Sequence, residues 1–269
     1  MPDQAYLPPH SDSVIGHVGG YRRVLPVNLD RMFENAIDWA HLPYLHDTSF
    51  AGIECVDAGP WGWRAEVANH DGSSSTLELL LDRRQRRWVT RNLGGPNEGA
   101  EIWTYVIELG AREIEIFVDF FVPGVPPEAR EKVGRAYAAA YERLYDEDER
   151  MMVQRQAALD LRVESANRSV EAVSLGRADG LTLPLSAQFD GRGVIVDRVD
   201  GQLVVYPDRC PHMLAPLEGV APRDGILTCP WHGYAFDLRS GACVSGHNCE
   251  LRSQVSAVEK DGDVLLVRA

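Results

Sequence analysis

The hydrophobic positions of the first part of the chain predict a helix, then an antiparallel sheet, then a long helix. Tyr21 to Val27 has the pattern of a strand, and a helix is expected from about Leu29, with Asp30 in its first turn, where the helix dipole favours acids. Apolar and polar residues then alternate, as in half-buried strands, in WGWRAEVA, STLELLLD, RRWVTRNL, EIWTYVIEL and EIEIFVDFFV. A long helix is predicted from about Glu128 to Leu161.

The pattern changes after this second helix. The stretch ESANRSVEAVSLGRADG, residues 164–180, loses periodicity and is expected to be a linker. Beyond it the chain has short strand-like runs separated by Gly and Pro, which is typical of a small all-β domain. We therefore expect an α+β protein of two domains. In residues 1–168 a long helix lies across a curved sheet with an apolar cavity between them, and residues 169–269 form the β domain.

The overall charge and the N-terminal residues exclude several classes of partner. The 269 residues carry a formal net charge of -13, which argues against binding to nucleic acid or to an anionic membrane. No run approaches the roughly 20 apolar residues that span a bilayer, and the N-terminus lacks the pattern of a signal peptide. We therefore expect a cytoplasmic protein, in which cysteine clusters more often bind metal than form disulfides.

Two short segments of the predicted β domain combine cysteine with histidine. Cys210-Pro211-His212 is followed, after sixteen residues, by Cys229-Pro230-Trp231-His232. Zinc fingers usually take a cysteine pair from one segment and a histidine pair from another. Mixed pairs instead fit a [2Fe-2S] cluster in which one iron takes both cysteines and the other both histidines, as in Rieske centres. A zinc site with the same four ligands is the alternative. Cys55, Cys243, His247 and Cys249 are interpreted as packing or surface residues.

A second set of polar residues lies on the first predicted helix. Asn35, Asp38 and His41 are three residues apart and share one face. His46 is too far around an ideal helix to align with His41. Pro43 disfavours regular helix at the preceding residue, and the resulting distortion would bring both imidazoles to one metal. A solvated helix face is the alternative.

Asp148 is the unusual residue of the long helix. The helical period places it within an apolar stripe that contains Tyr137, Tyr141, Leu144, Tyr145 and Met152. A carboxylate that faces a core is costly unless it is paired or bound to metal. Metal ligation explains this position, with a salt bridge to Arg or a loop cap as the alternatives.

Taken together, these motifs resemble the Rieske non-haem iron oxygenases. The segments CPHMLAPLEG, GILTCPWHGYAFDLRSGACV and DGDVLLV are similar to the family's cluster domain over essentially all of residues 172–269. The spacing N-x-x-D-x-x-H-x-x-x-x-H resembles its mononuclear-iron signature, most like the monooxygenase and demethylase branch that includes vanillate and dicamba O-demethylases. Glu147-Asp148 before a Gln-rich stretch resembles the position of its carboxylate ligand. The rest of residues 1–168 resembles the helix-grip (START/SRPBCC-like) catalytic domain.

The resemblance implies a role for each candidate residue. The [2Fe-2S] ligands would be Cys210, His212, Cys229 and His232. The ligands of a mononuclear Fe(II) would be His41, His46 and Asp148. Asn35 and Asp38 would be catalytic, with Asp38 as the bridge that hydrogen-bonds a ligand histidine to a cluster histidine of another domain.

The resemblance also implies an enzyme and its partners. The chain would use O₂ and electrons to hydroxylate or oxidatively dealkylate a small aromatic or otherwise apolar substrate. The electrons would come from a separate NAD(P)H-dependent reductase, directly or through a ferredoxin, because no dinucleotide-binding fingerprint is present in this chain.

The order of the two predicted domains departs from the family. Its members usually place the cluster domain first, whereas here it comes second. We expect a homotrimer, with electron transfer either within or between subunits. The alternative function is a Rieske electron-transfer protein fused to a ligand-binding helix-grip domain without catalytic iron.

Overall fold

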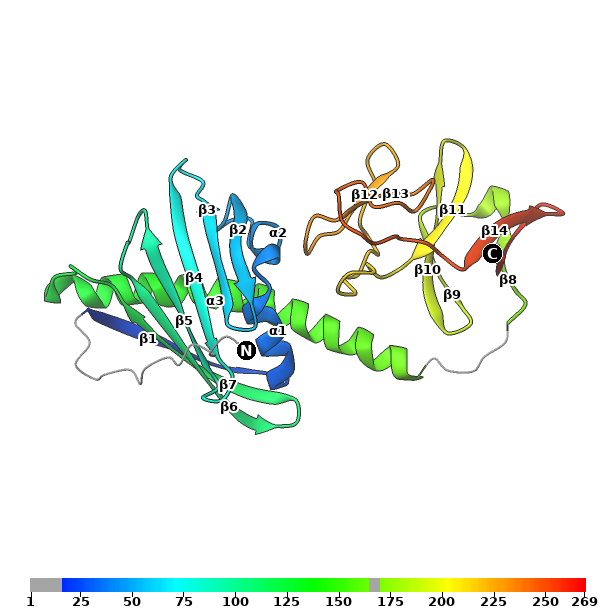
Figure 1. Cartoon of the computed structure of the whole chain (residues 1–269). Coiled ribbons are helices and arrows are strands. Elements are labelled where there is room, and N and C mark those ends of the chain that lie inside the picture. Colours follow the sequence, from blue (N-terminus) through cyan, green and yellow to red (C-terminus); the bar gives the residue numbers. More distant parts are fainter. Residues whose placement is uncertain (1–15, 165–169) are drawn as a thin grey trace. The chain divides into compact units, whose positions relative to one another are not determined.

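The computed structural model describes residues 16–164 and 170–269 (Figure 1). Contacts divide the chain into two compact units, Met1–Val153 and Gln154–Ala269, and the division falls inside the long helix α3 (Pro127–Glu164). The predicted boundary between residues 168 and 169 lies outside the described residues and stays a prediction. Among the helices that are described, none is both long enough and apolar enough to cross a membrane.

The first unit is built on a seven-stranded antiparallel sheet with the order β1-β7-β6-β5-β4-β3-β2 (Figure 1). Its strands are β1 (His17–Leu25), β2 (Gly52–Gly59), β3 (Gly62–Ala68), β4 (Ser74–Asp82), β5 (Arg87–Gly94), β6 (Glu101–Gly110) and β7 (Glu113–Phe121). The five alternating segments are confirmed as strands, and the last two form the expected hairpin. The edge strand β2 was not predicted, because it has no regular alternation of buried and exposed residues.

Alternate residues of β7 form the inner face of this sheet. Ile114, Ile116, Val118 and Phe120 are fully or almost fully buried, and fully burying such a side chain contributes about 1.5–3 kcal/mol. The Phe120 ring lies 5.3 Å and 5.1 Å from two tyrosine rings of α3, those of Tyr137 and Tyr141. The long helix therefore packs on the sheet, as predicted.

Contact between α3 and β1 is close enough to require glycine. A Cβ atom at Gly134 of α3 would lie 2.1 Å from the carbonyl oxygen of Val18, so no other residue fits this position without a shift of backbone. The helix begins at Pro127, since proline is well tolerated in a first helical turn.

The first helical segment is not one continuous helix. Helix α1 (Leu29–Ile37) is capped by Asn28, whose side chain accepts a hydrogen bond from the Arg31 N–H, and it ends at Asp38. A 3-10 turn, η1 (Trp39–His41), and the short α2 (Leu42–Leu45) follow. The prediction of a single helix distorted at Pro43 was wrong, because the break lies earlier and Pro43 falls in the first turn of α2, where its missing N–H costs no hydrogen bond.

The second unit consists of three small sheets. Their orders are β11-β10-β9, β12-β13 and β14-β15-β8. The strands are β8 (Ala172–Arg177), β9 (Leu185–Phe189), β10 (Arg192–Val199), β11 (Gln202–Pro207), β12 (Ile226–Thr228), β13 (Ala235–Asp237), β14 (Val255–Lys260) and β15 (Asp263–Arg268). The predicted linker at 164–180 was wrong over β8, which pairs with β15 although its sequence lacks a clear alternation. With a long helix packed on a seven-stranded sheet and three further small sheets after it, the α+β fold class is confirmed.

Candidate metal centres

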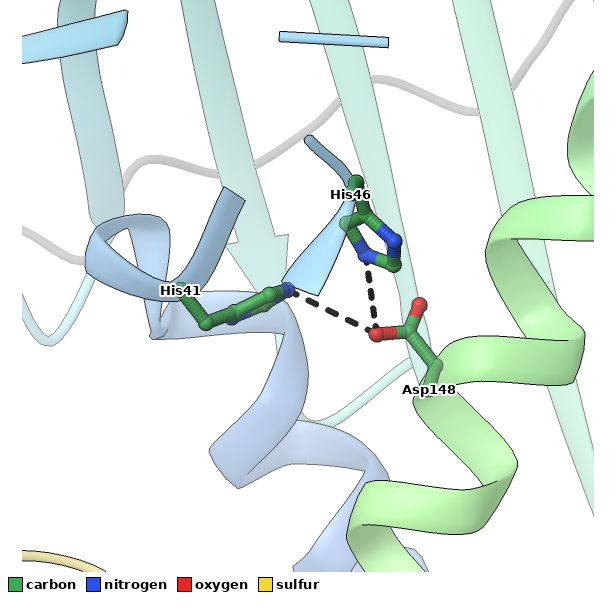
Figure 2. Close-up of side chains that lie close together, drawn as sticks. All are labelled: His41, His46 and Asp148. Atoms are coloured by element: carbon green, nitrogen blue, oxygen red, sulfur yellow. Dashed lines mark hydrogen bonds and ion pairs between the residues drawn. The ribbon is translucent and has the colours of Figure 1, made fainter. Parts of the chain in front are cut away.

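The first unit brings together His41, His46 and Asp148 (Figure 2). Each offers one ligand atom, and these atoms all lie within 4.8 Å of one another. The Nε2 atoms of His41 and His46 lie 3.5 Å and 3.1 Å from the same oxygen, Oδ1 of Asp148. The break after α1 explains why the two histidines meet: His41 ends the 3-10 turn and His46 follows α2, so both side chains turn toward α3.

Neighbouring polar side chains orient the three candidate ligands. The Asn35 side-chain N–H donates to Oδ1 of Asp148 at 2.8 Å, and Nδ1 of His46 donates to Glu147 at 2.6 Å. Nδ1 of His41 lies 3.5 Å from a carboxylate oxygen of Asp38. Each imidazole thus has a carboxylate at Nδ1, which leaves Nε2 for the centre of the group. Metal-binding histidines are oriented in the same way in known metalloproteins.

Burial and charge act in opposite directions at this site. Burial lowers the pKa of His41, but the carboxylates of Asp148 and Asp38 outweigh it and raise that pKa to about 9. Burial raises the pKa of Asp148, but hydrogen bonds from His41 and His46 outweigh burial and bring that pKa below its ordinary range. The protein alone therefore holds an ionised Asp148 carboxylate against a protonated His41 imidazole. A divalent cation can take the place of that proton, and two histidines with one carboxylate are the ligands of the facial triad of non-haem iron sites.

A cavity of about 120 Å³ opens at the three candidate ligands. Its walls come from α1, the sheet and α3, and they include the aromatic side chains of Phe50, Trp63, Trp88, Tyr141 and Tyr145. Trp63 is fixed in place by a 3.0 Å hydrogen bond from its indole N–H to the Ala36 carbonyl oxygen. No lysine or arginine is among the described residues that line the cavity. The site therefore combines possible metal ligands with a mainly apolar space.

Two loops of the second unit have the same backbone hydrogen bonding. In one loop the Cys210 N–H donates to the Ala215 carbonyl and the Leu214 N–H donates to the Cys210 carbonyl. In the other, the Cys229 N–H donates to the Tyr234 carbonyl and the Gly233 N–H donates to the Cys229 carbonyl. The residue four positions after each cysteine has a positive φ, 63° at Leu214 and 66° at Gly233. Each loop is thus a tight turn that presents one cysteine and one histidine.

The four predicted cluster ligands converge between these loops. The thiols of Cys210 and Cys229 are close enough to shift each other's pKa, and the rings of His212 and His232 lie 4.6 Å apart in a T-shaped arrangement. Each loop supplies one cysteine and one histidine, a mixed pairing that fits a two-iron cluster better than a zinc finger.

Backbone groups favour a thiolate in this second centre. Its hydrogen bond with Cys210 is the largest cause of the lowered pKa of Cys229, and N–H groups of Trp231 and His232 lower that pKa further. The neighbouring Cys229 thiol, together with burial, raises the pKa of Cys210. N–H groups aimed at sulfur also suit the thiolate ligands of iron–sulfur clusters.

Comparison with known proteins places the second centre in a family domain. Residues 172–255 match the family model of the Rieske [2Fe-2S] domain. The chain is 43% identical over 65 residues to pheophorbide a oxygenase of Oryza sativa subsp. japonica, which is 23% of this chain and 12% of that protein. It is 42% identical over 62 residues to a putative toluene-4-sulfonate monooxygenase system iron-sulfur subunit of Comamonas testosteroni, which is 23% of this chain and 18% of that protein.

Comparison with solved structures gives a match to about half of the chain. The crystal structure of TTHA0849 from Thermus thermophilus is 17% identical with a TM-score of 0.42, over 50% of this chain and 96% of that one. The matches to the two sequence relatives span less than a fifth of each relative's length.

The structure brings all the candidate residues into two groups, although their roles as ligands stay predictions. One group holds Asn35, Asp38, His41, His46 and Asp148, and the other holds Cys210, His212, Cys229 and His232. Sequence reasoning missed Glu147 as the partner of His46, because a helical wheel places it outside the apolar stripe. It also missed the cavity walls, although alternation along the strands could have identified the inward-facing Trp63, Trp88 and Thr104.

Proposed function

Residues 172–255 are a Rieske [2Fe-2S] domain, and from this premise we propose that the chain is the oxygenase component of a Rieske non-haem iron oxygenase. Electrons would come from a separate NAD(P)H-dependent reductase or a ferredoxin, and the product would be a hydroxylated or oxidatively dealkylated small apolar compound. The observation that carries the proposal is the group of His41, His46 and Asp148 at the cavity. A Rieske domain alone transfers electrons, whereas this group offers a site where electrons and O₂ can be used.

The proposal assigns one group to each centre. Cys210, Cys229, His212 and His232 would hold the cluster, with one cysteine and one histidine from each loop. His41, His46 and Asp148 would hold a mononuclear Fe(II). When bound, the cluster supplies one-electron transfer and the ferrous ion supplies O₂ activation.

The other residues of the first site have supporting roles in this proposal. Asn35 fixes the Asp148 carboxylate through its 2.8 Å hydrogen bond, and Glu147 fixes the ring of His46. The Asp38 carboxylate lies 3.5 Å from Nδ1 of His41 and would have the bridging role between that ligand and the cluster. The aromatic walls exclude water and position the substrate ring. Positioning by the protein, rather than the oxidative chemistry itself, is what such residues contribute.

The cavity limits the substrate. Its volume of about 120 Å³ is comparable to an engineered cavity of about 150 Å³ that binds benzene. A substrate whose reacting part is one aromatic ring or an apolar group of similar size would fit next to the candidate iron ligands. The predicted homotrimer and the predicted cytoplasmic location stay predictions.

Iron quantification combined with O₂ uptake tests this function. The purified holoprotein should contain about three iron atoms per chain, two in the cluster and one at the first site. With a surrogate reductase and a panel of small aromatic compounds, O₂ uptake should be coupled to formation of an oxygenated product. A protein with about two iron atoms per chain and no coupled uptake would be the electron-transfer alternative. A colourless protein with one zinc ion would contradict both.

A further inference from the structure

Two cysteines outside the candidate ligand sets lie opposite each other in the second unit. Cys243 and Cys249 are at the two ends of the segment CVSGHNC and were expected to be packing or surface residues. Ala242 pairs with Glu250 in an antiparallel bridge, and the Leu251 N–H donates to the Gly241 carbonyl. The same register places Cys243 directly opposite Cys249. Opposite residues of an antiparallel pair have Cα atoms about 4.5–5.5 Å apart, within the range of about 4.4–6.8 Å found for disulfides.

The side chains confirm this pairing. Both thiols are free and partly exposed, and each is close enough to the other to shift its pKa. Cys243 Sγ also lies 3.3 Å from the hydroxyl oxygen of Ser245. Within the part of the chain that the structure describes, no third metal-binding side chain joins them in a group. The pair is therefore suited to thiol chemistry rather than to metal binding.

The surroundings make the two thiols unequal. Burial raises the pKa of Cys243, but hydrogen bonds from the Ser245 hydroxyl and from the N–H groups of Ser245 and His247 outweigh it and lower that pKa. Burial, followed by the neighbouring Cys243, raises the pKa of Cys249 to about 11. A partly exposed thiol of lowered pKa next to a second thiol is the arrangement found in redox-active cysteine pairs, in which one sulfur attacks and the other resolves.

We propose that Cys243 and Cys249 form a thiol–disulfide exchange site that reacts with a low-molecular-weight disulfide of the glutathione class. The Cys243 thiolate attacks one sulfur of that disulfide, the S–S bond breaks, and one thiol of the reagent leaves while a mixed disulfide forms on Cys243. The Cys249 thiol then loses its proton and attacks the Cys243 sulfur, which releases the second thiol of the reagent. In sum, the two protein thiols are oxidised to a disulfide and the reagent disulfide is reduced to two thiols.

Stacked aromatic rings connect the loop between the two cysteines to one of the cluster loops. The loop between the two cysteines carries His247, whose ring stacks on Tyr234 with centroids 3.7 Å apart. Tyr234 in turn stacks on His212 at 4.5 Å. The disulfide would close the loop that contacts Tyr234, the residue that stacks on the candidate cluster ligand His212. The inference uses only the Rieske domain and does not depend on iron in the first unit.

The test uses the holoprotein, with its visible cluster absorption recorded in every sample. After incubation with oxidised glutathione, peptide mapping of the wild-type protein should give a Cys243–Cys249 disulfide. The Cys249→Ser variant should instead trap glutathione on Cys243, since the resolving thiol is absent. Cys55→Ser is the matched control and should leave the reaction unchanged. Cys243 should react faster than Cys55, because its pKa is lowered whereas burial raises the pKa of Cys55.

Three results would overturn the proposal. The first is a wild-type protein that keeps both thiols while its cluster absorption is intact. The second is a Cys249→Ser variant in which glutathione is found on Cys55 as fast as on Cys243. The third is a disulfide that involves Cys210 or Cys229 in place of the proposed pair. Loss of the cluster absorption itself would reveal a failure of the cluster assignment, which is a different result.

Discussion

Nδ1 of His46 donates a 2.6 Å hydrogen bond to Glu147, the residue immediately before Asp148 on α3. One turn of helix therefore supplies both a candidate metal ligand and the group that orients another. Glu147 fixes the imidazole so that Nε2, rather than Nδ1, faces Asp148. The geometry of the first centre thus depends on two adjacent carboxylates with different functions.

The first prediction follows from this contact. Glu147→Ala should weaken Fe(II) binding at the first centre about 10- to 100-fold, which is the usual effect of removing an outer partner of a metal-binding histidine. Competition with a chromogenic chelator measures the affinity. Glu142→Ala, an exposed position on the same helix, is the control and should bind Fe(II) as the wild type does. Equal affinity in both variants would show that the hydrogen bond does not orient a ligand.

Removal of Asp148 should affect the first metal centre and leave the cluster unchanged. Asp148→Ala deletes the carboxylate that both histidines contact, so the iron content should fall from about three to about two per chain and substrate oxygenation should be lost. The EPR spectrum of the reduced cluster should not change. Asp146→Ala is a suitable control, because Asp146 is half-exposed and only pairs with Arg23 at the surface. Full activity of Asp148→Ala would end the assignment of this residue as a ligand.

Much of the fold could be predicted because burial produces a period in the sequence. The inner face of β7 is a regular alternation of apolar residues, and the apolar stripe of α3 contains Tyr145 and Met152, which are both buried. The failures occur where no such period exists. Strand β2 is an edge strand without alternation, and β8 is held by pairing with β15, a contact that lies far away in the sequence.

The candidate site was predictable only in part. Asp148 could be identified, because a carboxylate in an apolar stripe needs an explanation, and it is 8% exposed. The contact between His41 and His46 depends on where α1 ends, and it ends at Ile37, well before the residue that Pro43 restricts. The Cys243–Cys249 pair depends on cross-strand register, which short irregular strands do not reveal in sequence.

Metal binding at the first centre should depend on pH. In the metal-free protein the pKa of His41 is raised to about 9, above the unfolded value of about 6.5, so its proton stabilises the fold below pH 6.5 and this contribution is lost as the pH rises through 9. A metal ion must displace this proton. Its affinity should therefore increase about tenfold per pH unit between pH 6.5 and 9.

Titration with Co(II) as a spectroscopic probe at several pH values measures this dependence. His46 contributes to it as well, because its pKa is also raised. An affinity that does not change with pH would mean that the imidazoles are already neutral in the metal-free protein.

Asp38 should influence electron delivery more than metal binding. Its carboxylate lies 3.5 Å from Nδ1 of His41 and is not among the three candidate iron ligands. We expect Asp38→Asn to keep both metals but to slow single-turnover product formation about 10- to 100-fold, by analogy with other carboxylates that support a histidine ligand. Asp30→Asn, exposed in the first turn of α1, is the control. Normal single-turnover kinetics in Asp38→Asn would remove the bridging role.

The cavity should select neutral substrates over anions. No lysine or arginine is among its described lining residues, while Asp38 and Asp148 contribute two carboxylates. An anionic substrate would lose its hydration without gaining a lysine or arginine partner, and the two carboxylates already offset the charge of a bound Fe(II), so its binding costs several kcal/mol. A difference of about 2.8 kcal/mol is a factor of about 100 in binding. We therefore expect 4-methoxybenzamide to be preferred over 4-methoxybenzoate, which has the same size and shape, by at least about 100-fold in kcat/KM. Substrate-dependent O₂ uptake with a surrogate reductase measures this ratio, and a preference for the carboxylate would contradict the neutral cavity.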